Sequence, residues 1–349
     1  MNNFLLEGKM NSYIEEAVQN ATGLPFHIQE IKRVSNGSMH PVAIFVGDRF
    51  SVFVKAGSNS FSNEHFHTEA FELEYIRKHS SVKAPEVIAV TQVQDITLLI
   101  LEAIQTVKPE SKKDWETLGR GLASLHRTEN ERCGFERETF LGIFKQDNTW
   151  KNTWTEFYGE CRLRDTMKIA QKAGKMNSEE CAIIERLIDA LPSLEIPQEA
   201  HSLLHGDPWL GNLLYDGKEL VIIDCSIYYG NREIDLTTVD FFCPVSNYFF
   251  DAYREQYPVQ EGFEKRADLW KINQWLGHIA LYGDRYKKHL FMLSINIYNY
   301  LPLSAEKSAY FSTYRKLLQI NLAVLPRLDK HGTVIGEQLR AGNARFFNL

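Results

Sequence analysis

The sequence predicts an α+β fold in which a small antiparallel β-sheet with one helix precedes a larger, mainly helical part. Two observations support this order. Short runs of β-branched and aromatic residues, separated by turn residues, fill residues 26–55. Helical periods then dominate, over residues 64–79, 112–127 and 178–191. Strands that are grouped ahead of the helices indicate an α+β fold.

The bulk composition narrows the class of protein. The chain has 349 residues, 44% of them hydrophobic and 24% charged, with a net charge of −6. The negative charge argues against nucleic acid or an anionic membrane as the main partner. No apolar run has the length of a membrane span, and the N-terminus lacks the order of a signal peptide. The five cysteines are scattered without a CxxC pair, which favours reduced thiols in the cytoplasm.

The first elements of the chain contain a candidate buried ion pair. The predicted strands are His27–Val34, Val42–Val46 and Phe50–Lys55. In the following helix Glu69 falls on an otherwise apolar stripe, and a buried carboxylate needs a partner. Lys55, at the end of the third strand, is the obvious candidate, although Glu72 and Glu74 could compete for it. The alternative is a surface lysine and a solvated helix face.

The turn between the first two strands is a candidate phosphate loop. Gly37 and Ser38 lie in it, and their backbone amides could face an anion. Only one glycine is present, which weakens the inference. Two further strands, Val87–Val90 and Thr97–Leu101, follow, and Glu102, Ala103 and Ile104 then leave the sheet.

The most informative stretch is Leu203–Asp235. Leu213–Tyr215 and Leu220–Ile223 read as two short strands joined by a two-residue Asp-Gly turn. Such a hairpin brings Asn212 and Asp224 to the same end, close to Asp207. Phosphoryl transfer needs one carboxylate to orient and deprotonate the attacking hydroxyl, and an amide oxygen and a second carboxylate to hold metal ions. Taken singly, each of these residues is more often a cap or an Asx-turn.

Two motifs in this stretch resemble a known family. They are HGDPWLGN (205–212) and DCSIYYGNREIDLT (224–237). The corresponding patterns HGDLWSGN and DPAxYYGDRExDLA are those of the fructosamine (ketosamine-3-) kinases, within the aminoglycoside-phosphotransferase and protein-kinase-like superfamily. Aromatic patterns over 133–164 and 253–286 extend the resemblance to about residues 15–286.

The resemblance implies a protein-kinase-like, two-lobed fold. A nucleotide-binding lobe would span residues 1–103 and a catalytic and substrate lobe residues 104–286. Residues 287–349 would form a basic extension, helical over 305–325, for which we recognise no counterpart. ATP and Mg²⁺ would be the cofactors.

The resemblance also assigns roles to residues. Asp207 would be the base, and Asn212 and Asp224 the metal ligands. Lys55, supported by Glu69, would hold the nucleotide phosphates with the loop at Gly37 and Ser38. Backbone groups of Glu102 and Ile104 would read the adenine edge.

The remaining candidate residues surround the base. Trp209 could be the platform for the substrate or a buried anchor for its loop. Arg232 and Glu233 could form an internal ion pair or could reach the sugar. His205 would shape the loop, and Asp235 would accept hydrogen bonds from its backbone.

The leading hypothesis is an ATP-dependent kinase of a sugar hydroxyl on a small-molecule or protein-bound ketosamine. One alternative keeps the chemistry and changes the acceptor to an aminoglycoside, choline-like amine or amino sugar. Another, less favoured because Lys55, Asp207, Asn212 and Asp224 are all retained, is a nucleotide-binding pseudokinase. A monomer and a homodimer are both compatible with the sequence.

The departures from the family pattern put the acceptor, and not the phosphoryl transfer, in doubt. The substituted positions are Pro208 for Leu, Leu210 for Ser, Cys225-Ser226 for Pro-Ala, Asn231 for Asp, and Thr237-Thr238 for Ala-Met. We expect them to lie near the acceptor.

Overall fold

The structure is a computed structural model that describes residues 5, 8–34, 39–194 and 196–290. The chain divides into two compact units. The first comprises Met1–Trp154, Glu199–Val239 and Val245–Val259, and the second Thr155–Gln198, Asp240–Pro244 and Gln260–Leu349. The first unit continues across residue 103, so the division into lobes at that residue stays a prediction. The predicted role of the extension also stays a prediction, because the described residues end at Leu290.

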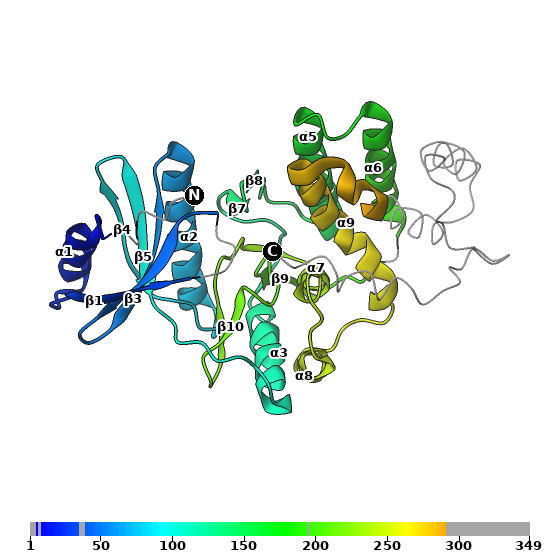
Figure 1. The fold of residues 1–349 in the computed structure, drawn as a ribbon. Helices are drawn as coiled ribbons and strands as arrows, with labels where there is room; N and C mark the ends of the chain where they lie inside the picture. Colours follow the sequence, from blue (N-terminus) through cyan, green and yellow to red (C-terminus); the bar gives the residue numbers. More distant parts are fainter. Residues whose placement is uncertain (1–4, 6–7, 35–38, 195, 291–349) are drawn as a thin grey trace. The chain divides into compact units, whose positions relative to one another are not determined.

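An antiparallel five-stranded sheet begins the first unit (Figure 1). Its order is β1-β2-β3-β5-β4, so only β4 and β5 depart from the order of the chain. The strands are β1 (Ile28–Arg33), β2 (Val42–Gly47), β3 (Ser51–Gly57), β4 (Val87–Val93) and β5 (Ile96–Glu102). All five predicted strands are therefore present, with ends that differ by a few residues.

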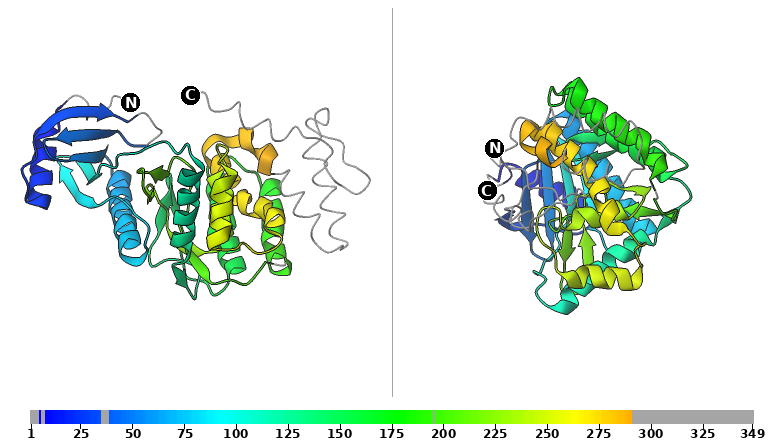
Figure 2. Two further views of the ribbon diagram at one scale, coloured as in Figure 1. Left: turned by 90° about the horizontal axis from the view of Figure 1, so that it is seen from below. Right: turned by 90° about the vertical axis from the view of Figure 1, so that its right-hand side faces the viewer.

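Two helices pack on opposite faces of this sheet. On one face Ile14 and Val18 of α1 (Asn11–Thr22) join a core with Val52 and Val54 of β3. Successive side chains of a strand alternate between its faces, so Lys55 points to the other one. There it meets α2 (Ser60–His79), the helix predicted over 64–79. Figure 2 shows the sheet and α2 in two further views.

The start of α2 follows ordinary capping rules. The side chain of Asn59 accepts a hydrogen bond from the Ser62 N–H at 2.7 Å, which satisfies one free amide of the first turn. Three basic residues in the last turn of α2 interact favourably with the negative end of the helix dipole. The sequence stripe that suggested this helix is buried, including Glu69.

The rest of the first unit supports the loop that carries Asp207. Its helices are α3 (Lys112–His126), α7 (Glu233–Val239) and α8 (Asn247–Gln256). Short strands form three small sheets: β6 (Glu129–Asn130), β9 (His201–Leu204) and β12 (Tyr228–Gly230); β7 (Thr139–Leu141) and β8 (Phe144–Gln146); and β10 (Leu213–Tyr215) and β11 (Leu220–Ile222). The sequence predicted only the last pair.

The β10–β11 hairpin is present, but its predicted two-residue turn is wrong. Tyr215 pairs with Leu220, so four residues, 216–219, form the connection. The Asp216 carboxylate accepts hydrogen bonds from the N–H groups of Lys218 and Glu219, both at 2.9 Å, and Gly217 has φ +90°. The Asp216 side chain thus closes the turn together with the hydrogen bond from the Asp216 N–H to the Glu219 carbonyl at 3.3 Å.

The second unit is helical. It contains α4 (Trp154–Phe157), which begins at the unit boundary, then η2 (Tyr158–Arg164), α5 (Asp165–Lys172), α6 (Ser178–Ala190), η3 (Leu191–Ser193), α9 (Phe263–Tyr282) and η4 (Gly283–Tyr286). The fully buried Tyr158 donates a hydrogen bond to the Leu269 carbonyl at 2.7 Å and packs edge-on against Trp270. The predicted helix 178–191 is α6, whereas the one over 305–325 lies outside the described residues. None of the helices in the described ranges is both long and apolar enough for a membrane span.

Two helical glycines should respond oppositely to alanine. A Cβ on Gly119 of α3 would lie 2.1 Å from the Phe249 carbonyl oxygen of α8, so Gly119→Ala should lower the free energy of unfolding by about 1–3 kcal/mol. A Cβ on Gly277 of α9 meets no described atom within 4 Å, so Gly277→Ala should raise it by about 0.5–1 kcal/mol. Thermal unfolding of both variants tests the pair; equal Tm changes would contradict the close approach of α3 and α8.

Candidate active site

A buried ion pair joins the sheet to α2. The Lys55 ammonium lies 2.7 Å from the Glu69 carboxylate, and the two side chains are 6% and 5% exposed. Lys55 also contacts the carboxylate of Asp224, which lies far along the chain. The structure therefore selects Glu69 over Glu72 and Glu74 as the helix partner of the lysine.

The three charges influence one another's protonation. Burial raises the pKa of Glu69, although Lys55 opposes this effect. Burial also raises the pKa of Asp224, but the nearby Lys55 ammonium outweighs it, and the net pKa of Asp224 is lowered. Asp224 thus carries its negative charge at neutral pH, with its side chain 41% exposed.

The loop that carries Asp207 is held from beneath by Asp235. This buried carboxylate accepts hydrogen bonds from the His205 N–H at 2.7 Å and the Gly206 N–H at 3.1 Å. The predicted hydrogen bonds between Asp235 and the loop backbone are therefore present. Gly206 has φ +85°, and a Cβ on it would lie 2.0 Å from the Ser226 carbonyl oxygen, so glycine is required there.

His205 is also fully buried beneath this loop. Its Nδ1 accepts a hydrogen bond from the Asp207 N–H at 3.3 Å, and its Nε2 lies 3.7 Å from the Cys225 thiol. Burial lowers the pKa of His205, so the ring is neutral at pH 7 and suited to accept from the Asp207 amide. The contacts of His205 are those of a residue that shapes the loop.

The carboxyl group of Asp207 has a raised pKa. Burial, and next the negative charges of Asp224 and Asp235, raise the pKa of Asp207 to about 7, while a hydrogen bond from Asn212 opposes the rise. A base whose pKa lies near the working pH combines a deprotonated fraction with a driving force for proton uptake.

Asn212 and Asp224 form an oxygen donor set of the kind that magnesium takes. The Asn212 amide nitrogen donates to the Asp207 carbonyl oxygen at 3.0 Å and lies 3.5 Å from the Asp224 carbonyl oxygen, which directs its side-chain oxygen away from these groups. An amide oxygen and a carboxylate, completed by phosphates and water, suit Mg²⁺. The residues present therefore fit the ion, although no larger cluster of metal-ligating His, Cys, Asp or Glu occurs in the described parts of the chain.

Behind the loop, Asp235 belongs to a longer buried network. Its carboxylate lies 3.1 Å from His126 Nε2, and His126 Nδ1 lies 2.7 Å from the Tyr253 hydroxyl. The Tyr253 hydroxyl accepts from Arg232 at 3.3 Å, and Arg232 pairs with Glu199 at 3.0 Å. Arg232 is 1% exposed and its ion pair is with Glu199, so its guanidinium is not free for a sugar. The predicted pair between Arg232 and Glu233 stays a prediction.

The other predicted residues have mixed outcomes. Trp209 is partly exposed, and its indole packs over Gly211, where a Cβ would lie 2.1 Å from the ring. Gly37 and Ser38 lie outside the described residues. Glu102 ends β5, and its N–H donates to the Glu86 carbonyl at 2.9 Å. Ile104 follows the strand, on the segment that leaves the sheet.

Sequence reasoning missed several residues around this site. His40 and His65 lie 3.2 Å apart, Nε2 to Nδ1, and burial, then Lys55, lower the pKa of His65 to about 4. Glu72 and Gln146 contact the segment that follows Asp224. The one feature of the sequence that could have pointed to these residues is Glu72, a second glutamate on the apolar side of α2. The contacts themselves join segments that are distant in the chain, and a single sequence does not reveal them.

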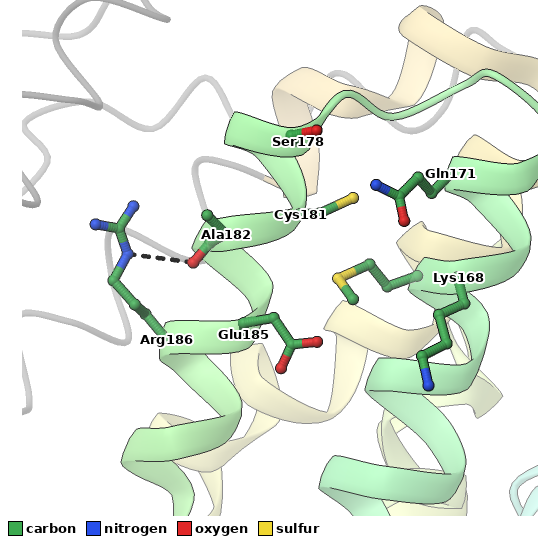
Figure 3. Close-up of a pocket in the computed structure, with 8 residues that line it drawn as sticks. Lys168, Gln171, Ser178, Cys181, Ala182, Glu185 and Arg186 are labelled. Atoms are coloured by element: carbon green, nitrogen blue, oxygen red, sulfur yellow. Dashed lines mark hydrogen bonds between the residues drawn. The ribbon is translucent and has the colours of Figure 1, made fainter.

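The second unit has a separate shallow pocket of about 510 Å³ between α5 and α6 (Figure 3). Met167 and Gln171 line it from α5, and Cys181 and Glu185 from α6. The carboxylate of Glu185 is held by Arg164, with oxygen–nitrogen distances of 2.7–3.1 Å. None of the predicted site residues lines this pocket.

Buried histidines should make stability depend on pH. Burial lowers the pKa of His126 below its value of about 6.5 in the unfolded chain, against the opposing effect of Asp235. The stabilisation is therefore present above pH ~6.5 and is lost as the pH falls below it, because the unfolded chain binds a proton that the folded one excludes.

We expect the free energy of unfolding to fall less steeply between pH 7 and pH 5 in His126→Gln than in the wild type, as measured by urea unfolding. Replacement of the exposed His27 by Gln is the control and should leave the slope unchanged. The same slope in all three proteins would show that His126 does not exclude a proton.

Comparisons with known proteins agree with this fold. The model of the fructosamine kinase family matches residues 10–296. The protein-ribulosamine 3-kinase, chloroplastic, of Arabidopsis thaliana is 30% identical over 272 residues, which cover 76% of this chain and 81% of that protein. Mouse ketosamine-3-kinase is 29% identical over 267 residues, covering 69% of this chain and 85% of the relative.

Solved structures support the predicted protein-kinase-like α+β fold. A candidate fructosamine-3-kinase of Thermobifida fusca has a TM-score of 0.71 with 26% identity and covers 81% of this chain and 98% of its own. An aminoglycoside phosphotransferase in a ternary complex with ADP and hygromycin B has a TM-score of 0.52 at 13% identity, covering 86% and 98%, a likeness of fold alone. The predicted family and fold are confirmed: the chain belongs to the fructosamine kinase family.

Proposed function

We propose that this protein transfers the γ-phosphoryl group of ATP to a sugar hydroxyl of a ketosamine. The observation that carries the proposal is the gathering of Lys55, Asp207 and Asp224 in one unit of a fructosamine kinase family member, with Lys55 paired to Glu69. The relatives named ketosamine-3-kinase and protein-ribulosamine 3-kinase support a glycated amine as acceptor.

Asp207 is the base in this proposal. Its carboxylate orients the acceptor hydroxyl and takes its proton as the oxygen attacks the γ-phosphorus. The raised pKa of about 7 supports this role, because a carboxylate with an ordinary pKa would be a weaker proton acceptor.

The phosphates of ATP and the metal ion are bound in this proposal by Lys55, Asn212 and Asp224. Lys55 faces the phosphates, and Glu69 keeps its ammonium in place. Asn212 and Asp224 would hold Mg²⁺, which supplies charge neutralisation of the phosphates when bound. The N–H of Glu102 is already used by Glu86, so we assign the adenine edge to the Glu102 carbonyl and the Ile104 backbone, with Gly37 and Ser38 near the phosphates.

Trp209 is the best candidate for contact with the acceptor. Its partly exposed indole follows the base by two residues, and an aromatic face suits both a sugar ring and a protonated amine. We assign Arg232, His205 and Asp235 to support of the loop, because all three are buried against protein groups. The five free cysteines support a reducing compartment such as the cytoplasm.

An acceptor panel tests the substrate class. The purified protein should transfer labelled phosphate from Mg·ATP to ribulosyl-lysine and fructosyl-lysine at rates at least about tenfold above those with an aminoglycoside, choline or a free amino sugar. A ketosamine-modified peptide in the same panel separates free from protein-bound acceptors. Turnover confined to the aminoglycoside, choline or amino-sugar arms would replace the proposed acceptor class.

Removal of the proposed base should separate chemistry from binding. Asp207→Ala should lower kcat by about 10²–10⁴-fold, while the Kd for Mg·ADP changes by less than about threefold. Asp251→Ala, an exposed aspartate on α8, is the control and should keep wild-type kinetics. Unchanged kcat in the Asp207 variant would remove this residue from the base role.

A further inference from the structure

Helix α2 carries a second buried carboxylate, one turn after the glutamate that holds Lys55. Glu72 is 2% exposed and lies three residues after Glu69, so both point to the same side of the helix. Glu72 Oε1 accepts a hydrogen bond from the backbone N–H of Ile227 at 2.8 Å. Ile227 lies three residues after Asp224, so α2 contacts both Lys55 and the segment of Asp224.

This hydrogen bond does not depend on the charge of Glu72. Burial raises the pKa of Glu72 well above its usual range, although the Ile227 N–H opposes the rise. A carboxylate and a neutral carboxylic acid both have an oxygen that can accept from a backbone N–H. The contact therefore persists in either protonation state, and an amide side chain of the same length could make it.

Ser226 fixes the same segment from another direction. Its hydroxyl donates to Gln146 Oε1 at 2.6 Å, and its backbone N–H donates to the His205 carbonyl at 2.8 Å. Gln146 ends β8, in the β7–β8 hairpin that follows α3 along the chain. The family pattern has alanine at position 226, which cannot form the side-chain hydrogen bond.

The segment needs such support because Asp224 has an unfavourable backbone. Its φ of +49° lies in the left-handed region, which a residue other than glycine occupies at a cost of about 1–2 kcal/mol. Strained conformations of this kind persist only where the surroundings fix them. Hydrogen bonds at positions 226 and 227, two and three residues after the strained one, are suitably placed to do so.

We propose that Glu72, together with the Ser226–Gln146 hydrogen bond, positions Asp224 for metal binding by holding its segment in the strained conformation. The inference rests on the proposed function in taking Asp224 as a metal ligand. Glu72 and Gln146 act through Ile227 and Ser226, so they are positioning residues. Glu69 and Glu72 thus make α2 a common support for Lys55 and Asp224.

Nucleotide binding with and without metal tests the inference in the full-length protein. The Kd of ADP is measured by calorimetry in magnesium and in EDTA, for the wild type, Glu72→Ala and Glu72→Gln. Glu72→Ala should weaken Mg·ADP binding by about tenfold and leave metal-free ADP binding within about twofold, as expected when a group that orients a metal ligand is lost. Glu72→Gln should restore the wild-type Kd, since its amide oxygen can accept from Ile227.

Two further variants complete the design. Glu74→Ala, on the exposed side of the same helix, should match the wild type. Ser226→Ala introduces the family's own residue, so it should fold, and loss of one hydrogen bond should weaken Mg·ADP binding about three- to tenfold. A general loss of stability would weaken ADP binding in magnesium and in EDTA by the same factor. The ratio of these two Kd values therefore distinguishes a change at the metal ligand from a general loss of stability.

The outcomes separate the inference from the function on which it rests. A wild type that binds ADP equally with and without magnesium would refute the metal assignment itself. Clear magnesium dependence in the wild type with an unchanged ratio in Glu72→Ala and Ser226→Ala would overturn the inference alone. Loss in Glu72→Gln as large as in Glu72→Ala would also overturn it, because charge and not hydrogen-bond acceptance would then be the requirement.

Discussion

The buried ammonium of Lys55 is the constraint on which the candidate site depends. A charge that is 6% exposed is strongly unfavourable without partners, and the structure supplies Glu69 from α2 and Asp224 from the loop after β11. These elements are distant in sequence, and each is placed by its own packing. The lysine can be buried only when all three meet, so the sheet face, the helix register and the loop position are fixed together.

The two loops of the site are stabilised in the same way. Each has a strained or glycine-dependent backbone, and beneath each a buried side-chain carboxyl group accepts from backbone N–H groups: Asp235 beneath the Asp207 loop and Glu72 beneath the segment after Asp224. An acceptor of this kind satisfies amides that bend away from regular structure and fixes their direction. The side chains of Asp207 and Asp224 can then remain partly accessible, because the rigidity comes from the groups behind them.

Local patterns predicted the fold better than the details of the site. The strands of the sheet and α2 follow from alternation and helical period, and Lys55 with Glu69 follows from the cost of an unpaired charge on an apolar stripe. The predicted length of the turn at 216–219 was wrong because the Asp216 side chain accepts hydrogen bonds from backbone amides of the turn. The Asp-Gly pair alone does not reveal that contact. Glu72, Gln146 and the Arg232–Glu199 pair depend on contacts between distant segments, for which a single sequence carries no signal.

Several residues that depart from the family pattern have local structural contacts. The side chain of Asn231 caps α7 by accepting from the Glu233 N–H at 2.9 Å, and the hydroxyls of Thr237 and Thr238 donate to the Ile234 carbonyl. Those three side chains are buried and bonded to the backbone, which gives them a local structural role, and their nearness to the acceptor stays a prediction.

The substitutions at 225 and 226 also face inward. Cys225 is buried against His205, and Ser226 bonds to Gln146, so both act on the support of Asp224. Of the substituted positions, only Pro208 and Leu210 adjoin Trp209, and of these Leu210 is the more exposed. Under the proposed function, any difference in acceptor preference that arises from these substitutions should come from Pro208 and Leu210, since the other substituted side chains contact groups beneath the two loops or the backbone of α7.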